Sequence, residues 1–88
     1  MPSVTIHVPP ALSSASQARD VVCDASTVRE ALRQLAELRP QYASRIFYGD
    51  RLLVVVMLNG AHVAPTSVLE TQLSEGDRID LLVPVAGG

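Results

Sequence analysis

The chain has 88 residues, of which 48% are hydrophobic and 18% are charged, and its formal net charge is −2. A chain of this length forms one folded domain, and the balance of apolar and charged residues argues against disorder. The seven basic residues are arginines scattered along the chain, so we expect no basic surface for nucleic acid. The single cysteine, Cys23, excludes an internal disulfide and fits a reducing compartment.

Several other classes of protein are excluded by what the chain lacks. The start, Met1-Pro2-Ser3, carries no signal-peptide features, and no apolar run reaches transmembrane length, so we expect a cytoplasmic protein without a membrane contact. One cysteine and two distant histidines cannot hold a metal, and a phosphate loop cannot form without lysine. We therefore expect no metal and no cofactor bound by this chain.

The first quarter of the chain predicts two strands. Residues 3–8 alternate apolar and polar side chains, which is typical of a half-buried strand, and Pro9 ends it. His7 belongs to the solvent face of this strand. The small, Ser-rich residues 11–17 predict a loop, and residues 18–23 predict a second strand that forms a hairpin with the first. The alternation leaves two choices for the inward face of this strand: Val21 with Cys23, or Val22.

One helix is strongly indicated in the middle of the chain. Thr27 and Glu30 form a capping box, in which the Thr27 hydroxyl accepts from the Glu30 amide. Pro40 ends the helix near residues 38–39, and a short second turn is expected through residues 42–46. The apolar face expected for the main helix consists of Val28, Ala31, Leu32, Leu35 and Leu38.

The second half of the chain predicts further strands. Residues 52–58 are continuously apolar, which favours a central strand covered on both faces. Asn59-Gly60 predicts a type I′ hairpin turn before a return strand at residues 61–63. After a turn at residues 74–77, residues 78–83 alternate again, with inward positions expected at Ile79, Leu81 and Val83.

These elements predict an α+β fold in which one main helix covers one face of a mixed four- to five-stranded sheet. The last strand is expected to run beside the first, through the middle of the sheet. Residues 1–83 then form the domain, and residues 84–88 form a flexible tail.

The tail, Pro84-Val85-Ala86-Gly87-Gly88, is the strongest functional feature. Two final glycines carry no side chains and can enter a narrow channel, and five extended residues reach about 17 Å. The terminal carboxylate is anionic at neutral pH and a poor electrophile, so it reacts only after conversion to an acyl-adenylate. Because the chain shows no other catalytic constellation, the Gly88 carboxylate is the candidate reactive group.

Residues 75–88, with Gly76-Asp77 before a strand and the diglycine end, resemble the C-terminal signature of the MoaD/ThiS sulfur carriers, which are ubiquitin-like β-grasp proteins. The helix and the Asn59-Gly60 turn extend the resemblance over most of the chain. The tail is closest to those of the molybdopterin synthase small subunit and of cysteine-synthesis carriers. Val83 departs from the family where many molybdopterin carriers have a second proline, and the loop at residues 11–17 is longer than in the shortest relatives.

The resemblance implies a carrier that is not itself an enzyme but a co-substrate or small subunit of a sulfurtransferase complex. A ubiquitin-activating-type adenylyltransferase would use ATP and Mg²⁺ to adenylate Gly88. A rhodanese, a cysteine desulfurase or sulfide would supply sulfur for a thiocarboxylate, and a synthase subunit would accept it. Exposed apolar residues of the sheet would dock the partner, and the path of the tail would be lined by Gly87, Ala86, Val85 and Pro84.

The receiving pathway stays open, in the order molybdopterin, cysteine, thiamin and specialised metabolites. Two alternatives to a sulfur carrier also stay open. One is a ubiquitin-like modifier conjugated through Gly88 to lysines of other proteins, and the other is an interaction domain whose tail is incidental.

Overall fold

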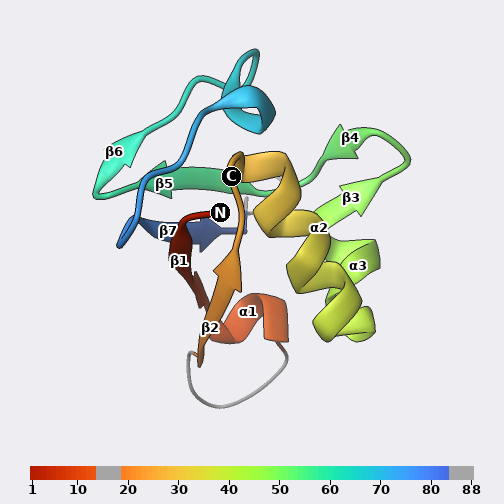
Figure 1. Ribbon diagram of the computed structural model, residues 1–88. Coiled ribbons are helices and arrows are strands. Elements are labelled where there is room, and N and C mark those ends of the chain that lie inside the picture. The colour runs from red at the N-terminus through yellow and green to blue at the C-terminus, as the bar shows by residue number, and fades with distance from the viewer. Residues whose placement is uncertain (14–18, 84–88) are drawn as a thin grey trace.

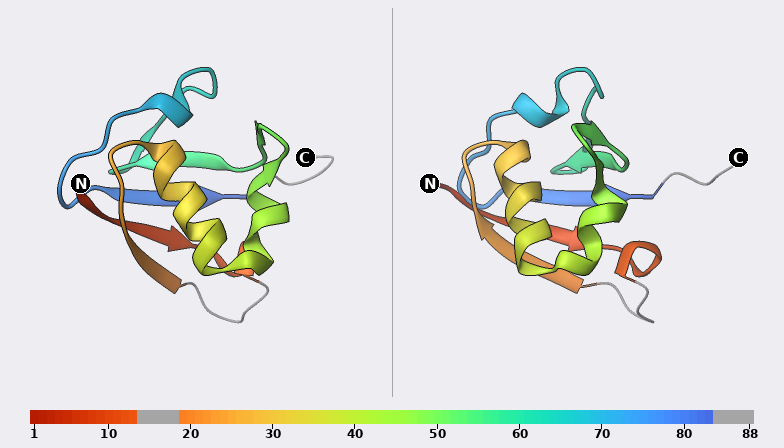
Figure 2. Two further views of the ribbon diagram at one scale, coloured as in Figure 1. Left: turned by 45° about the vertical axis from the view of Figure 1, so that its right-hand side comes forward. Right: turned by 90° about the vertical axis from the view of Figure 1, so that its right-hand side faces the viewer.

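The computed structural model describes residues 1–13 and 19–83, which fold into a mixed sheet with helices packed on one of its faces (Figures 1 and 2). The five-stranded sheet has the order β2-β1-β7-β5-β6, and a separate two-stranded sheet joins β3 and β4. The strands are β1 (Ser3–Val8), β2 (Arg19–Asp24), β3 (Phe47–Tyr48), β4 (Arg51–Leu52), β5 (Val55–Leu58), β6 (Ala61–His62) and β7 (Arg78–Leu82). The helices are α1 (Pro10–Ser13), α2 (Val28–Leu38), α3 (Pro40–Ile46) and the 3₁₀ turn η1 (Val68–Glu70).

The expected position of the last strand is confirmed. β7 runs parallel to β1 and antiparallel to β5, so it occupies the centre of the sheet. β1 and β2 form the expected antiparallel hairpin. The α+β class, with one main helix against a mixed sheet, is therefore correct.

The main helix begins as its sequence indicated. The Thr27 hydroxyl accepts from the Glu30 amide at 3.2 Å, and the helix ends at Leu38 before Pro40. Leu38 does not belong to the core, because its side chain is 51% exposed at the last turn. The helix residues that are fully buried against the sheet are Val28, Ala31, Leu32 and Leu35.

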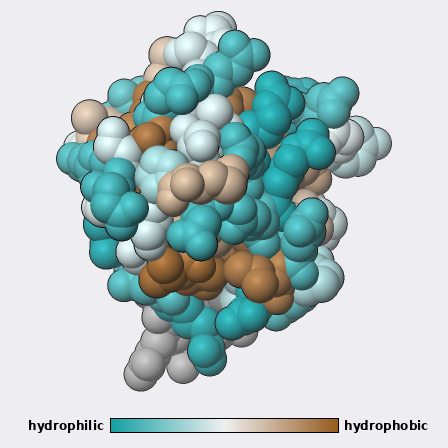
Figure 3. All heavy atoms as spheres, in the orientation of Figure 1, coloured by the Kyte–Doolittle hydropathy of each residue, from teal (hydrophilic) through white to brown (hydrophobic). Residues whose placement is uncertain are grey.

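The surface over the end of α2 is apolar. In Figure 3 hydrophilic residues cover most of the visible face, and hydrophobic residues form a band over β2, α1 and the C-terminal end of α2.

Among the helices described, none is long and apolar enough to cross a membrane.

The loop predicted at residues 11–17 is wrong in its first part, where residues 10–13 form the short helix α1. Proline suits the first position of a helix because its fixed φ is helical and its missing N–H has no partner to lose there. Leu12 is buried in the core, which holds this turn against the sheet. Residues 14–18 lie outside the described part of the chain.

The second strand resolves the choice left open by its alternation. Cys23 is buried and Val21 packs against the core, whereas Val22 is 65% exposed on the opposite face. Pairing with β1 imposes this orientation, because Cys23 lies opposite the inward residue Val4.

The continuous strand predicted over residues 52–58 is wrong. The chain bends at Leu53 and Val54, so β4 pairs with β3 while β5 enters the main sheet beside β7. The turn at Gly49 (φ +62°) lets β3 and β4 pair locally, and the Leu53 N–H donates to the Ile46 carbonyl at 2.7 Å. β5 therefore lies one strand from the sheet edge, and its outer face is only partly covered.

The turns were predicted correctly. Asn59 (φ +50°) and Gly60 (φ +84°) join β5 to β6, and Gly76 (φ +84°) turns the chain into β7. Val83 was expected to point inward but is 38% exposed, because regular pairing ends at Leu82.

Candidate functional site: the strand that leads to the tail

The predicted site residues, Pro84, Val85, Ala86, Gly87 and Gly88, lie outside the described residues. The structure instead describes the platform from which they continue, namely β7 and the groups that hold it.

β7 is held along both of its edges. Ile79 lies opposite Ile6 of β1, and Leu82 lies opposite Val55 of β5. Ile79 and Leu81 are fully buried beneath α2. Burial of a side chain of this size stabilises the fold by about 1.5 to 3 kcal/mol, so β7 cannot slide without losing its core contacts.

The start of β7 is tied to the β5–β6 turn by side-chain hydrogen bonds. The Arg78 N–H donates to Asn59 Oδ1 at 2.8 Å, and Asn59 Nδ2 donates to Asp77 Oδ1 at 2.9 Å. The second oxygen of Asp77 accepts from the Ser74 N–H at 2.7 Å. We call these three residues, Asn59, Asp77 and Arg78, the register clamp.

A second set of bonds ties the turn at residues 74–77, which precedes β7, to β1. The Gly76 N–H donates to the Ser3 carbonyl at 2.8 Å, and the Ser3 N–H donates to Glu75 Oε1 at 2.8 Å. The Thr5 N–H donates to the Asp77 carbonyl at 3.0 Å. β7 therefore starts from a turn fixed to both neighbouring strands.

The hydrogen bonds of the register clamp lower the pKa of Asp77. Hydrogen bonds from Asn59 and from the Ser74 amide hold the pKa of Asp77 below its ordinary value, because they favour the carboxylate. Asp77 is therefore ionised and accepting at neutral pH.

The end of β7 presents an apolar surface. Leu82 is 48% exposed on the face of the sheet away from α2, and Val83 follows it at the surface. Val55 lies opposite Leu82 and is partly exposed beside it. We call Val55, Leu82 and Val83 the exit patch, since the chain passes through it toward residue 84.

The same open face carries a charged cluster next to the exit patch. His7 Nδ1 lies 2.8 Å from Asp20 Oδ1, and Arg78 Nε lies 3.3 Å from Asp80 Oδ1. Arg78 also reaches Asp20 at 3.8 Å. His7 faces the open side as expected and is hydrogen-bonded to Asp20 rather than free.

Other reactive groups are few in the part of the chain that the structure describes. No set of three metal-ligating side chains comes together among residues 1–13 and 19–83. Cys23 is buried, and burial together with the neighbouring Asp24 charge raises the pKa of its thiol, which disfavours the nucleophilic thiolate.

Sequence reasoning missed the register clamp. The Asn59-Gly60 pair was interpreted only as a turn, and Asp77 only as part of another turn. Their contact joins positions 18 residues apart in the sequence, so no local pattern reveals it.

Comparison with known proteins places this platform in a family. The model of the ThiS family matches residues 10–88, from α1 through the whole of β7 to the diglycine. The chain belongs to the ThiS family. The MoaD/ThiS resemblance and the ubiquitin-like β-grasp fold are thereby confirmed. A search of curated proteins found no match.

Solved structures similar to this ThiS-family chain include two archaeal modifier proteins and a chain of a BexX/CysO complex. The small archaeal modifier protein 1 from Methanosarcina acetivorans is 24% identical, with a TM-score of 0.80 over 100% of this chain and 98% of that one. SAMP1 from Haloferax volcanii is 29% identical, with a TM-score of 0.73 over 98% and 99%. The Amycolatopsis orientalis BexX/CysO complex contains a chain that is 23% identical, with a TM-score of 0.76 over 97% and 99%.

Proposed function

We propose that this protein is a sulfur carrier whose Gly88 carboxylate is adenylated and then converted to a thiocarboxylate. The observation that carries the proposal is the family match over residues 10–88, which takes in both the central strand and the diglycine that follows it. The chain presents the reactive group, and the partners supply the chemistry, so we propose that the chain is not an enzyme. The carrier binds no cofactor itself.

The proposed cycle has two chemical steps at the Gly88 carboxyl group. The carboxylate oxygen attacks the α-phosphorus of ATP on the activating enzyme, with Mg²⁺, and pyrophosphate leaves. A hydrosulfide ion then attacks the carbonyl carbon of Gly88, the bond to the phosphate oxygen breaks, and AMP leaves. With a persulfide donor the first product is an acyl disulfide, and a second thiol must cleave it to release the thiocarboxylate. Because Gly88 has no side chain, its carbonyl is sterically open to attack.

In this proposal the exit patch and the tail both bind the partner, each at a different place. Leu82, Val83 and Val55 contact the partner at the root of the tail, while Pro84, Val85, Ala86 and Gly87 line the path to the reactive carbonyl. The thiocarboxylate sulfur then attacks an acceptor in a synthase, for which molybdopterin is the first candidate, before cysteine, thiamin and specialised metabolites.

A modifier function is the second candidate, and the similarity to the two archaeal modifier proteins favours it. It shares the adenylation step and differs in the acceptor, which would be a lysine of another protein. Since this chain has no lysine, it cannot form lysine-linked chains of itself.

Intact mass spectrometry separates the candidates. After incubation with ATP, sulfide and the cognate activating enzyme, a carrier gains about 16 Da as oxygen is replaced by sulfur. Diglycine remnants on lysines of other proteins would identify a modifier instead. If the mass does not change, although the same activating enzyme modifies another carrier, the chain is an interaction domain whose tail is incidental. Full activity of a chain that lacks Gly88 would refute both the carrier and the modifier mechanisms.

A further inference from the structure

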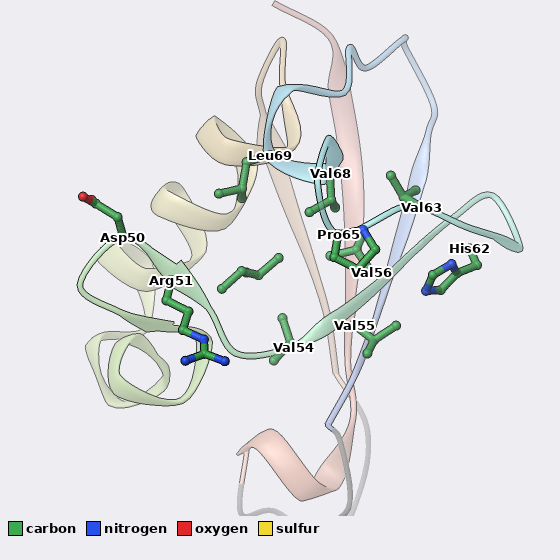
Figure 4. A pocket seen from close by; sticks show the side chains of 11 residues that line it. Asp50, Arg51, Val54, Val55, Val56, His62, Val63, Pro65, Val68 and Leu69 are labelled. Atoms are coloured by element: carbon green, nitrogen blue, oxygen red, sulfur yellow. The ribbon is translucent and has the colours of Figure 1, made fainter.

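A pocket of about 380 Å³ lies at the outer edge of β5, away from the register clamp (Figure 4). Arg51 comes from the β3–β4 hairpin, Val54 from the bend before β5, and Val63, Val68 and Leu69 from the segment after β6. Figure 4 shows these side chains arranged around the start of β5, so the pocket is a notch in the edge of the sheet.

The notch exists because β6 is short. β6 pairs with β5 at two positions, Leu58 opposite Ala61 and Met57 opposite His62, and the Val63 N–H then donates to the Val56 carbonyl at 3.2 Å. After Val63 the chain turns away toward η1. The stretch of β5 edge nearest Val54 therefore has no strand beside it in the described part of the chain.

Val54 has backbone polar groups available at this edge. The Val56 carbonyl accepts from the Val63 N–H at this edge, and Val54 lies two residues earlier, at the bend just before β5. Within residues 1–13 and 19–83, neither its N–H nor its carbonyl makes a hydrogen bond. Val54 is 6% exposed and lines the notch. Nearly buried backbone groups strongly favour a partner.

The walls of the notch define what fits it. Val54, Val68 and Leu69 offer aliphatic surface, whereas Arg51 is exposed and has no ion pair within the described chain. In Figure 4 the Asp50 side chain points away from the other lining residues, and the Arg51 side chain extends down to about the level of Val54. One unpaired cation beside an apolar hollow complements an aliphatic side chain followed by a carboxylate.

We propose that this notch binds an extended segment of a partner protein, which adds to the β5 edge at Val54. One aliphatic side chain of the segment fills the hollow, and a neighbouring Asp or Glu pairs with Arg51. Main-chain bonds supply affinity in this mode of recognition, and the side-chain pocket supplies specificity. Val55 of β5 lies opposite Leu82 of β7, and neighbouring strands are about 4.8 Å apart. The notch and the exit patch are therefore close to each other. The notch adjoins the exit patch through Val55, and the inference does not require the tail chemistry.

A capped peptide tests the proposal on the full-length protein. The probe is acetyl-Thr-Val-Val-Glu-Thr-Gly-amide, titrated into isotope-labelled protein while backbone amide shifts are followed by NMR. We expect shifts concentrated at Arg51, Val54, Val56 and Leu69, with a dissociation constant on the order of 1 mM, because a short flexible peptide loses much freedom on binding. The Val54 amide should also exchange with solvent more slowly once the peptide is bound.

Matched variants separate the elements of the site. Arg51→Glu should weaken binding about tenfold or more by reversing the charge, whereas Arg33→Glu, on the exposed face of α2, should leave it unchanged. A peptide with N-methylated valines cannot pair with the edge and should also bind at least about tenfold more weakly.

Three results would overturn the proposal. The first is an absence of shifts at concentrations of several millimolar. The second is a set of shifts centred on the exit patch rather than on the notch. The third is a change in the Val68 and Leu69 signals, which lie away from the new chain end at Val83, when residues 84–88 are deleted, since the occupant would then be the chain's own tail.

Discussion

Replacing Asn59 by alanine should destabilise the protein through the register clamp. The variant loses the bonds to the Arg78 N–H and to Asp77 Oδ1, and each is worth about 0.5 to 1 kcal/mol at this exposed position. It also places alanine at φ +50°, where a side chain that cannot hydrogen-bond to the nearby backbone is strained, and this costs about 1 kcal/mol more. The expected loss is about 2 to 3 kcal/mol, a large share of the total stability of a domain this small.

Two control variants separate these contributions. Asn59→Gly removes the same hydrogen bonds but tolerates the positive φ, so it should cost about 1 kcal/mol less than Asn59→Ala. Gly60→Ala, in the same turn at φ +84°, meets no atom within 4 Å and should cost the backbone strain alone. A double mutant of Asn59→Ala and Asp77→Ala should be more stable than the sum of the single losses predicts, by about 0.5 to 1 kcal/mol.

Urea unfolding followed by circular dichroism measures these free energies, and thermal unfolding should show a shift of about 4 to 8 °C for each kcal/mol. The reasoning fails if Asn59→Ala costs less than about 0.5 kcal/mol, which is the lower bound for a single hydrogen bond. It also fails if Asn59→Gly and Asn59→Ala are equally destabilising, since strain would then have no part in the effect.

Three further predictions concern acid stability, partner docking and the thiol. Because the folded-state pKa of Asp77 is depressed, its stabilisation is present above about pH 4 and lost as the pH falls through the folded value. The gap in unfolding free energy between wild type and Asp77→Asn should thus shrink from pH 6 to pH 2.5, and a constant gap would refute this. Leu82→Glu in the exit patch should slow thiocarboxylate formation about tenfold, whereas Val22→Glu on β2, at a residue that is also exposed, should change it less than twofold. Equal effects would place the docking surface elsewhere. Cys23 should react with iodoacetamide at pH 8 at least about tenfold more slowly in the folded protein than in urea, because its thiol is buried and has a raised pKa. Rapid reaction of the folded protein would contradict this.

Local signals in the sequence were sufficient for the elements whose cause is local. The Thr27 cap and Pro40 define the main helix because each acts on backbone groups within one turn of itself. Asn59-Gly60 predicts its turn because the two residues tolerate positive φ wherever they occur. The candidate reactive residues, Gly87 and Gly88, were likewise found from their position and their lack of side chains.

The sequence by itself therefore determined the fold class, the main helix, the turns and the residues proposed for chemistry. Only the tertiary structure decided that Cys23 rather than Val22 is buried, that residues 52–58 divide between two sheets, and that Leu38 and Val83 reach the surface. The physical reason is that an apolar residue has no preferred face until a neighbouring strand or helix covers one of its sides. The register clamp and the β5 notch depend on contacts between distant parts of the chain in the same way, since each requires β5 and its neighbours to be in place.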